Sequence, residues 1–256
     1  MTEFAADLYH GTAECYDRFR LPYPAVLIDD LVGRVQPSGR GWLLDLACGT
    51  GQLAFALQDH FTEVWAVDQE PDMIRMVQAK GAVHAIASSA ETLSAAPTSF
   101  ELITIGNAFH RLDRDQVARR ALGWLHPGGY LALCWSSSPW AGDRAWQLAL
   151  NELLDEWRAE LGADDRVPPG WDKVRPHRDV LIAAGFESVS RYQFTVERQW
   201  TVGDLAGLVY STSFLPAPLL GARAAEFEGD LADRLGPHGT LADDLSFAYD
   251  LARKPC

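Results

Sequence analysis

The chain has 256 residues, 48% of them hydrophobic, which is enough to build the core of one large domain or of one domain with a cap. Its formal net charge of −13 makes DNA, RNA and anionic membranes poor candidate partners, because an acidic surface repels phosphates. The four cysteines form no Cys-x-x-Cys pair and no histidine cluster accompanies them, so we expect no metal site. Without a signal-peptide pattern or a run of about 20 apolar residues, the chain is expected to be cytoplasmic.

The first 135 residues alternate between helical stripes and short apolar runs. Residues 1–36 read as an aromatic arm followed by a helix, which we expect to act as an N-terminal lid. Residues 41–135 then predict strands that are apolar on both faces with helices between them, which is typical of a parallel sheet covered on both sides. The expected strands are a run beginning at Leu43 and the segments 63–68, 83–87, 100–106 and 130–135.

The pattern changes after residue 136. Residues 143–161 are amphipathic at helical spacing, and the segment 168–170 reads as a loop. The remaining expected elements are a helix over 178–184, a long strand over 186–199, helices over 205–214 and 219–235, and a last strand over 246–252. The helices between 139 and 235 predict a cap, and the strand 186–199 is expected to return to the sheet.

One stretch has the form strand, tight loop, helix. It runs from Leu43 to Leu57 and turns at Gly49-Thr50-Gly51. Glycine allows a loop backbone to approach a ligand closely, and the following helix directs unpaired N–H groups to the same place. The loop lacks the Lys-Ser/Thr of a phosphate-binding P-loop, but Ala54 still permits a dinucleotide fingerprint, so a nicotinamide or flavin enzyme stays open.

The segment Leu44-Asp45-Leu46-Ala47-Cys48-Gly49-Thr50-Gly51 resembles the first motif of class I S-adenosylmethionine-dependent methyltransferases of the small-molecule type. The nearest group in pattern is that of trans-aconitate and ubiquinone-biosynthesis methyltransferases. The resemblance covers nearly the whole chain. It implies an α/β, Rossmann-like sheet of seven mostly parallel strands with an antiparallel last strand, helices on both faces and a helical cap, all in a single domain over 1–256.

The resemblance also implies a binding site for S-adenosyl-L-methionine. Asp45 would hold the methionine amino group, while Gly49 and Gly51 would let the loop backbone pass close to it. Asp68, at the end of the second strand, would accept hydrogen bonds from the ribose hydroxyls. Ala47 stands where many relatives have glycine and should fit if its φ is negative. For Asp45 and Asp68 the alternative is a structural acid that caps a loop or a helix start.

Further cofactor contacts are implied along the same edge of the sheet. Gln69 and Met73 would lie near the adenine. Ser89 replaces the aspartate that contacts the adenine edge in relatives, whereas Ala90 and Glu91 keep the pattern. The last implied cofactor residue is Asn107.

Asn107 opens a segment that ends the fourth strand. This segment, Gly106 to Asp113, resembles a family stretch in which His110 is kept and Arg111 replaces the usual tryptophan. His110 is therefore a candidate catalytic base or acceptor-positioning residue, since a histidine can take a proton near neutral pH.

The N-terminal arm resembles the family pattern Tyr-x-x-x-Arg-Pro-x-Tyr-Pro over Tyr16 to Pro24. Arg20 would pair with the cofactor carboxylate, and Tyr16 would contact the cofactor and close over the methyl group. The alternative is a packed helix with surface arginines.

The acceptor pocket is expected to be aromatic, and its candidates besides His110 are Trp135, Trp140, Tyr210 and Phe214. We therefore expect an S-adenosylmethionine-dependent methyltransferase that acts on an oxygen or nitrogen of a small metabolite or natural-product intermediate, as a monomer or homodimer. The alternatives are a cyclase or non-transferring relative that keeps the cofactor site and, less favoured, a nicotinamide-dependent oxidoreductase.

Overall fold

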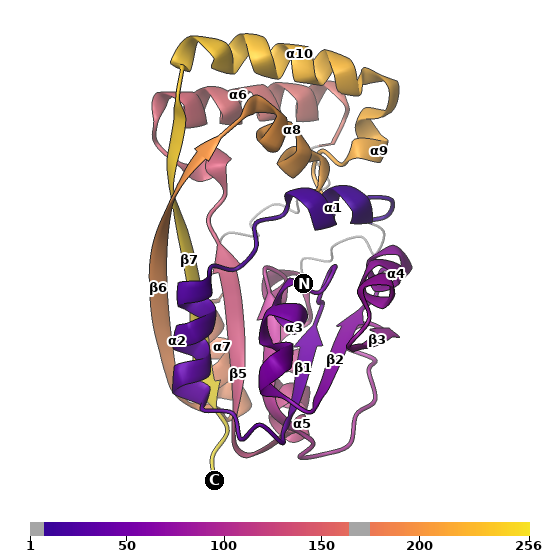
Figure 1. The fold of residues 1–256 in the computed structure, drawn as a ribbon, viewed down its shortest axis with the longest axis vertical. Coiled ribbons are helices and arrows are strands. Elements are labelled where there is room, and N and C mark those ends of the chain that lie inside the picture. The colour runs from indigo at the N-terminus through magenta and orange to yellow at the C-terminus, as the bar shows by residue number, and fades with distance from the viewer. Residues whose placement is uncertain (1–7, 164–174) are drawn as a thin grey trace. The chain divides into compact units, whose positions relative to one another are not determined.

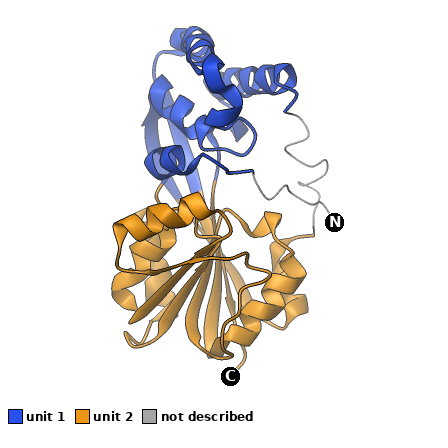
Figure 2. Ribbon diagram, turned by 90° about the vertical axis from the view of Figure 1, so that its right-hand side faces the viewer, with its two compact units in different colours: residues 1–21, 137–171, 195–246 blue, residues 22–136, 172–194, 247–256 orange. Residues whose placement is uncertain are grey.

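The computed structural model describes residues 8–163 and 175–256, which group into two compact units (Figure 2). The sheet unit comprises residues 22–136, 172–194 and 247–256. The helical unit comprises residues 1–21, 137–171 and 195–246. The loop predicted at 168–170 lies outside the described residues.

A seven-stranded sheet has the strand order β3-β2-β1-β4-β5-β7-β6 (Figure 1). Neighbouring strands from β3 through β5 pair in parallel, whereas β7 pairs antiparallel with β5. The predicted fold class, with its antiparallel strand inserted beside the fifth, is confirmed. The strands are β1 Trp42–Leu46, β2 Glu63–Asp68, β3 His84–Ala87, β4 Phe100–Gly106, β5 Leu125–Ser136, β6 Glu187–Trp200 and β7 Leu241–Arg253.

Helices of the sheet unit cover both faces of the sheet. In Figure 1, α2 and α3 lie in front of the sheet, and α5 and α7 lie behind it. On α2 the buried residues Leu27, Ile28, Leu31 and Val35 recur at helical spacing and face the sheet. The helices are α2 Ala25–Val35, α3 Gln52–Leu57, α4 Pro71–Lys80, α5 Arg114–Trp124 and α7 His177–Ala184.

The core of the sheet unit lies between the strands and the helices α5 and α7. Apolar residues of β1 and β4 pack there against the buried faces of the two helices. Burial of each such large side chain contributes about 1.5–3 kcal/mol to folding. Representative members are Leu44, Phe100, Ile103, Ile105, Val117, Ala121, Val180 and Leu181.

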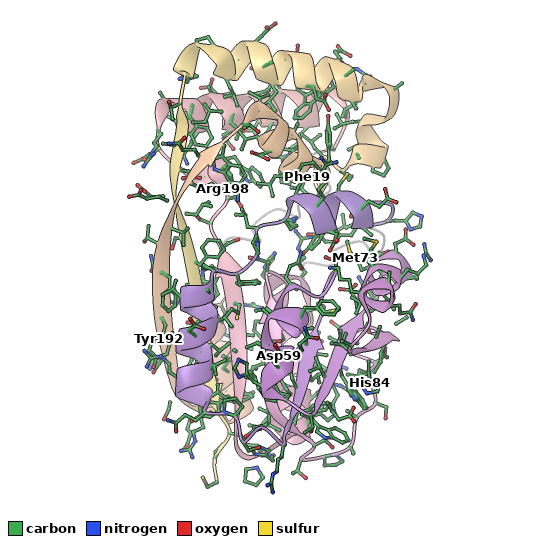
Figure 3. All side chains as sticks on the ribbon, in the orientation of Figure 1. Phe19, Asp59, Met73, His84, Tyr192 and Arg198 are labelled. Atoms are coloured by element: carbon green, nitrogen blue, oxygen red, sulfur yellow. The ribbon has the colours of Figure 1, made fainter. Side chains whose placement is uncertain are left out.

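The helical unit contains α1 Ala13–Phe19, α6 Ala145–Glu160, α8 Val202–Tyr210, α9 Ala217–Leu220 and α10 Ala224–Leu235. α6 packs on α10, where the rings of Trp157 and Phe227 meet edge to face at 5.5 Å. α1 packs on α8, where Phe19 (labelled in Figure 3) lies over Gly207 so closely that a Cβ there would be 2.4 Å from the ring.

Two predicted helices of this unit have different bounds. The helix expected over 205–214 runs from Val202 and ends at Tyr210. The helix expected over 219–235 is divided, because Gly221 has φ of 51° and its left-handed backbone separates α9 from α10. The strand expected over 246–252 begins earlier, at Leu241.

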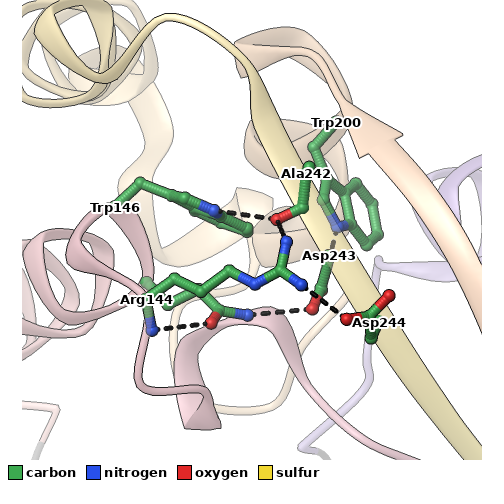
Figure 4. A network of polar contacts seen from close by, with 7 residues as sticks. Arg144, Trp146, Trp200, Ala242, Asp243 and Asp244 are labelled. Atoms are coloured by element: carbon green, nitrogen blue, oxygen red, sulfur yellow. Dashed lines mark hydrogen bonds and ion pairs between the residues drawn. The ribbon is translucent and has the colours of Figure 1, made fainter.

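A polar network, the Asp243 network, joins three segments of the helical unit (Figure 4). The buried carboxylate of Asp243, on β7, accepts hydrogen bonds from Gln147 Nε2 on α6 at 2.9 Å and from Trp200 Nε1 on β6 at 3.1 Å. Beside it, Arg144 Nη1 and Trp146 Nε1 both donate to the Ala242 carbonyl. Each buried donor in this network is thereby satisfied.

Over the described ranges no helix is long and apolar enough to cross a membrane. In the same residues no group of three His, Cys, Asp or Glu side chains could hold a metal ion. All four cysteines are free thiols, and Cys48 and Cys134 are buried.

Candidate functional site: the loops at the carboxyl ends of the strands

The loop from β1 to α3 is a tight turn with left-handed backbone at three positions. Gly49 and Gly51 have φ of 56° and 89°, and the Gly51 N–H donates to the Cys48 carbonyl at 2.9 Å. The Cys48 N–H donates to the Val67 carbonyl on β2, which holds the loop against the neighbouring strand. The glycines therefore provide the close backbone path that the sequence predicts.

Ala47 is the third left-handed position, with φ of 52°. The condition under which alanine was expected to fit without strain, a negative φ, is not met. An L-residue in this conformation costs about 1–2 kcal/mol, because Cβ crowds the following carbonyl. The hydrogen bonds on either side of this residue hold the turn in place. Alanine therefore occupies a position at which glycine would adopt the same backbone conformation without strain.

Asp45 is almost fully buried, at 1% exposure. Its Oδ2 accepts from the Ala54 N–H in the first turn of α3 at 3.1 Å, and its Oδ1 accepts from the Thr104 hydroxyl at 2.7 Å. Burial raises the pKa of Asp45 to about 7, although both hydrogen bonds lower it. These contacts are those of a carboxylate that caps a helix start, and its role toward the methionine amino group stays a prediction.

Asp68 lies at the carboxyl end of β2. One oxygen accepts from the Gly49 N–H at 2.8 Å, and the other accepts from the Glu70 N–H at 2.9 Å. Burial raises the pKa of this carboxyl, whereas the backbone hydrogen bonds lower it. A carboxylate has about four acceptor positions, so the hydrogen bonds from the Gly49, Gln69 and Glu70 N–H groups still leave capacity for a ligand hydroxyl. The predicted binding of the ribose hydroxyls by Asp68 stays a prediction.

The other predicted cofactor residues follow β2 and β3. Gln69 is exposed, whereas Met73, on α4 (Figure 3), is 2% exposed. Ser89 is half-buried, and its hydroxyl accepts from the Thr92 N–H at 3.3 Å, while Ala90 is buried. Glu91 accepts from the Asp113 N–H at 3.0 Å and so ties this loop to the start of α5. Their contacts with a cofactor stay predictions.

Asn107 follows β4 in a left-handed conformation, with φ of 50°. Its Nδ2 donates to Tyr23 Oη at 3.3 Å, and its Oδ1 accepts from the Ser136 N–H at 3.1 Å. Tyr23, which precedes α2 in the chain, thus contacts residues at the carboxyl ends of β4 and β5. Sequence reasoning assigned no role to Tyr23 or Ser136; the Pro22-Tyr23-Pro24 pattern was the available signal for the tyrosine. A Cβ on Gly106 would be 2.8 Å from Tyr23 Oη, so a larger residue at this position would displace the tyrosine hydroxyl.

His110 lies one turn beyond Asn107 in the short helix η2, Phe109–Arg111. Its Nε2 accepts a hydrogen bond from Arg111 Nε at 3.2 Å. Burial lowers the pKa of His110 to about 3, and the positive charges of Arg111, His177 and Arg114 act in the same direction. The imidazole is therefore neutral at pH 7 and a weak base, which favours the positioning role over the base role.

The N-terminal arm places its predicted residues within the helical unit. The Arg20 guanidinium lies over the Tyr16 ring, 4.8 Å from its centroid, and its Nη2 donates to the Ser211 carbonyl at 3.0 Å. Arg20 Nε is buried and has no hydrogen-bond partner among the residues that the structure describes. This free donor is compatible with binding an anion, and the predicted pairing with the cofactor carboxylate stays a prediction.

The structure brings two of the predicted acceptor residues together. Trp140 and Phe214 meet edge to face in the helical unit, with ring centroids 5.3 Å apart. Tyr210 instead uses its hydroxyl within the unit, donating to Glu228 Oε1 at 2.8 Å. Trp135, in the sheet unit, lies under the Arg191 guanidinium at 4.7 Å. Contact of any of them with an acceptor stays a prediction.

Comparison with known proteins agrees with this geometry. The sequence profile of the methyltransferase domain family matches residues 43–129, from the start of β1 into β5. Two uncharacterized methyltransferases of Mycobacterium tuberculosis are 29% and 30% identical over 200 and 155 residues, covering 78% and 58% of this chain and 74% of each relative. A ubiquinone/menaquinone biosynthesis C-methyltransferase of Zymomonas mobilis is 25% identical over 213 residues, covering 73% of this chain and 86% of the relative.

Among solved structures, the [4+2]-cyclase SpnF superposes with a TM-score of 0.52 at 20% identity, over 90% of this chain and 81% of its own. At that identity the likeness shows a shared fold alone. The sheet order, the glycine loop after β1, the acid at the end of β2 and the sequence relatives agree. The chain belongs to the class I S-adenosylmethionine-dependent methyltransferases.

Proposed function

We propose that this enzyme transfers the methyl group of S-adenosylmethionine to an oxygen or nitrogen atom of a small molecule. The observation that carries the proposal is the Asp68 carboxylate, which is fixed by the Gly49 and Glu70 N–H groups at the carboxyl ends of the parallel strands. Ligands of open α/β sheets bind at this edge. The net charge of −13 disfavours a nucleic-acid acceptor, and one relative is named for quinone biosynthesis.

The residues present fit the cofactor. Left-handed glycines at 49 and 51 keep the loop free of side chains, and Asp68 retains acceptor capacity for the ribose. Gln69 and Met73 would border the adenine, and Ser89 would supply a hydroxyl in place of the usual carboxylate. When bound, the cofactor supplies a methyl group on a positively charged sulfur.

The contribution of the chain to the reaction is then mainly alignment. An acceptor atom must lie about 3–3.5 Å from the methyl carbon, on the side opposite the sulfur. With a pKa of about 3, His110 is poorly suited to remove a proton from an alcohol or ammonium group. His110 is better suited to orient an acceptor that is already a competent nucleophile.

We further propose that the two compact units form a single methyltransferase domain over 1–256, with the helical unit as its cap. Family membership sets aside the nicotinamide-dependent oxidoreductase. The alternative that the chain keeps the cofactor but transfers no methyl group, as a cyclase would, predicts the same cofactor site.

One experiment separates these possibilities. Purified protein is titrated with S-adenosylhomocysteine in a calorimeter and then incubated with S-adenosylmethionine and a panel of small acids, alcohols, amines and quinones. Tight binding together with a product that gains one methyl group supports the proposal. Tight binding without methylated product or S-adenosylhomocysteine from any acceptor would contradict it and favour the non-transferring relative.

A further inference from the structure

One connection of the parallel sheet has no helix. The strands β3, β2, β1 and β4 run parallel to one another, and a connection between parallel strands usually contains a helix that covers the sheet. Residues 88–99, which join β3 to β4 and are all described, contain turns and no helix. This connection buries Ala90 and Leu93 in the core, but Trp42 on β1 stays 37% exposed. Part of the sheet face is therefore left open.

A pocket of about 550 Å³ lies on this part of the sheet and is lined by Trp42, Glu63, Trp65 and His84 (labelled in Figure 3). We call it the β3 pocket. Trp42 is in register with Glu63, and Trp65 is in register with His84. Because residues two apart on a strand share a face, all four side chains project from the same face of the sheet. Trp42, Glu63 and His84 are the first residues of their strands, so the pocket lies at the amino ends, opposite to the predicted cofactor loops.

Two indole rings form the wall of the β3 pocket. Trp42 and Trp65 are stacked, with ring centroids 6.1 Å apart and an angle of 30° between their planes. The buried ring of Phe100, on β4, meets them edge to face, with centroids 6.2 Å from Trp42 and 5.4 Å from Trp65. Phe100 holds both indoles in place without a ligand, so little side-chain ordering is required when one binds.

The charge of the β3 pocket comes from a carboxylate. Glu63 Oε2 lies 2.6 Å from His84 Nε2, and the Glu63 side chain is 39% exposed. Among the described residues that line the pocket there is no lysine or arginine. The formal charge of −13 on the whole chain adds to the attraction for a cation. The pocket is therefore complementary to positive charge.

The dimensions of the β3 pocket favour a small molecule over a macromolecule. Pockets that bind small ligands enclose about 300–1,000 Å³. A peptide that adds a strand depends on main-chain hydrogen bonds, and β3 is only 4 residues long. A stable dimer buries about 800 Å² on each partner. In the described strands β1, β2 and β3, however, Trp42 is the one large apolar side chain that is exposed.

We propose that the β3 pocket binds a flat organic cation, such as an aromatic quaternary ammonium, whose ring stacks on the indole pair and whose charge lies beside Glu63. Of the aromatic side chains, tryptophan attracts cations most strongly, because the face of its ring is negative. A flat ring also gains from offset stacking on an indole. The pocket is separate from the site proposed for methyl transfer, so binding there requires no turnover.

The test is a calorimetric titration of the full-length protein with N-methylquinolinium. Saturating S-adenosylhomocysteine is present throughout, so that the predicted cofactor site is filled. The matched probe is quinoline, a ring of nearly the same shape that is uncharged at neutral pH. We expect one bound cation per chain. Quinoline should bind about tenfold more weakly, because it lacks the attraction of a positive charge to the indoles and to the carboxylate.

Two variants locate the binding. Glu63→Gln removes the charge at nearly constant volume, and Trp42→Leu removes one ring but keeps an apolar side chain. Each should weaken cation binding about tenfold or more. The matched control is Glu187→Gln, the same substitution on β6 at the opposite edge of the sheet, where Glu187 lies 3.8 Å from Arg253 Nη1. The control should bind the cation as wild type does. Unchanged affinity for S-adenosylhomocysteine and an unchanged melting temperature show that each variant is folded.

Several results would overturn the assignment. Absence of cation binding would do so, as would equal affinity for N-methylquinolinium and quinoline, which would indicate a pocket for apolar rings of any charge. Unchanged binding in Glu63→Gln, or an equal loss in Glu187→Gln, would show that Glu63 has no specific role. Sedimentation velocity tests a different occupant: a wild-type dimer that Trp42→Leu converts to a monomer would show that a second copy of the chain covers this face.

Discussion

Two carboxylates, Asp45 and Asp68, occupy the ends of β1 and β2 and differ in what they can still bind. Asp45 is enclosed, and both of its oxygens contact protein donors within β4 and α3. Asp68 accepts hydrogen bonds from the backbone N–H groups of Gly49, Gln69 and Glu70, which fixes its orientation. The contacts therefore distinguish Asp45, a carboxyl that is enclosed by protein donors, from Asp68, a carboxylate that is predicted to bind a ligand.

Replacing Asp68 with alanine should weaken binding of S-adenosylhomocysteine by about 1–3 kcal/mol, because hydrogen bonds to the ribose are lost from a nearly buried site. Calorimetry at neutral pH measures this. Asp68→Asn keeps one acceptor oxygen and should lose less affinity. Unchanged affinity in Asp68→Ala would show that the ribose is held elsewhere.

The raised pKa of Asp45 predicts that the free energy of unfolding depends on pH. Its pKa in the folded protein, about 7, lies above its ordinary value of 3.8, so the folded state holds a proton that the unfolded state has released. The resulting stabilisation is fully present below pH 3.8 and is lost as pH rises through about 7. Asp45→Asn keeps an acceptor for the Ala54 N–H and a donor to Thr104. The variant should lack this loss, which urea unfolding between pH 4 and pH 8 would measure; parallel pH profiles of wild type and variant would contradict the assignment.

Between elements of the helical unit, α1 packs tightly on α8 at Gly207. A Cβ there would meet the Phe19 ring at 2.4 Å. Gly207→Ala should therefore lower the free energy of unfolding by about 1–3 kcal/mol, the usual range for overpacking. The matched control is Gly203→Ala in the same helix, where the nearest atom is 3.9 Å away. The control should be neutral or slightly stabilising in urea denaturation, and an equal loss in both would refute the packing explanation.

The elements that could be predicted from sequence are those defined by local pattern. The run at Leu43, the glycines at 49 and 51 and the acid at 68 lie within 26 positions, and their types determine a strand, a turn and a second strand. Local pattern did not reveal the left-handed φ of Ala47, because the restraints on it come from β2. Nor did it reveal the lowered pKa of His110, which comes mainly from burial of the ring in the folded protein, with smaller contributions from Arg111, His177 and Arg114.

At the scale of the whole molecule, the strand order brings late segments to early ones. β7 lies between β5 and β6 in the sheet, and Tyr249 on β7 donates to Asp30 on α2 at 2.5 Å. In the helical unit Asp243 on the same strand satisfies donors from α6 and β6. Long-range pairing of this kind is invisible to local periodicity, which explains why the strand was predicted to begin at 246 although it begins at 241.

This role of β7 determines the order in which the protein can assemble. Until residues 241–253 have been synthesised, β5 and β6 each present an unpaired edge, and Gln147 and Trp200 have no common acceptor. Nascent chains that stop before β7 should therefore stay protease-sensitive and bind chaperones, because unpaired strand edges promote association. The methyltransferase sheet would be completed only once β7 is available, and a slow, closing step of refolding would report the insertion of one strand between two others.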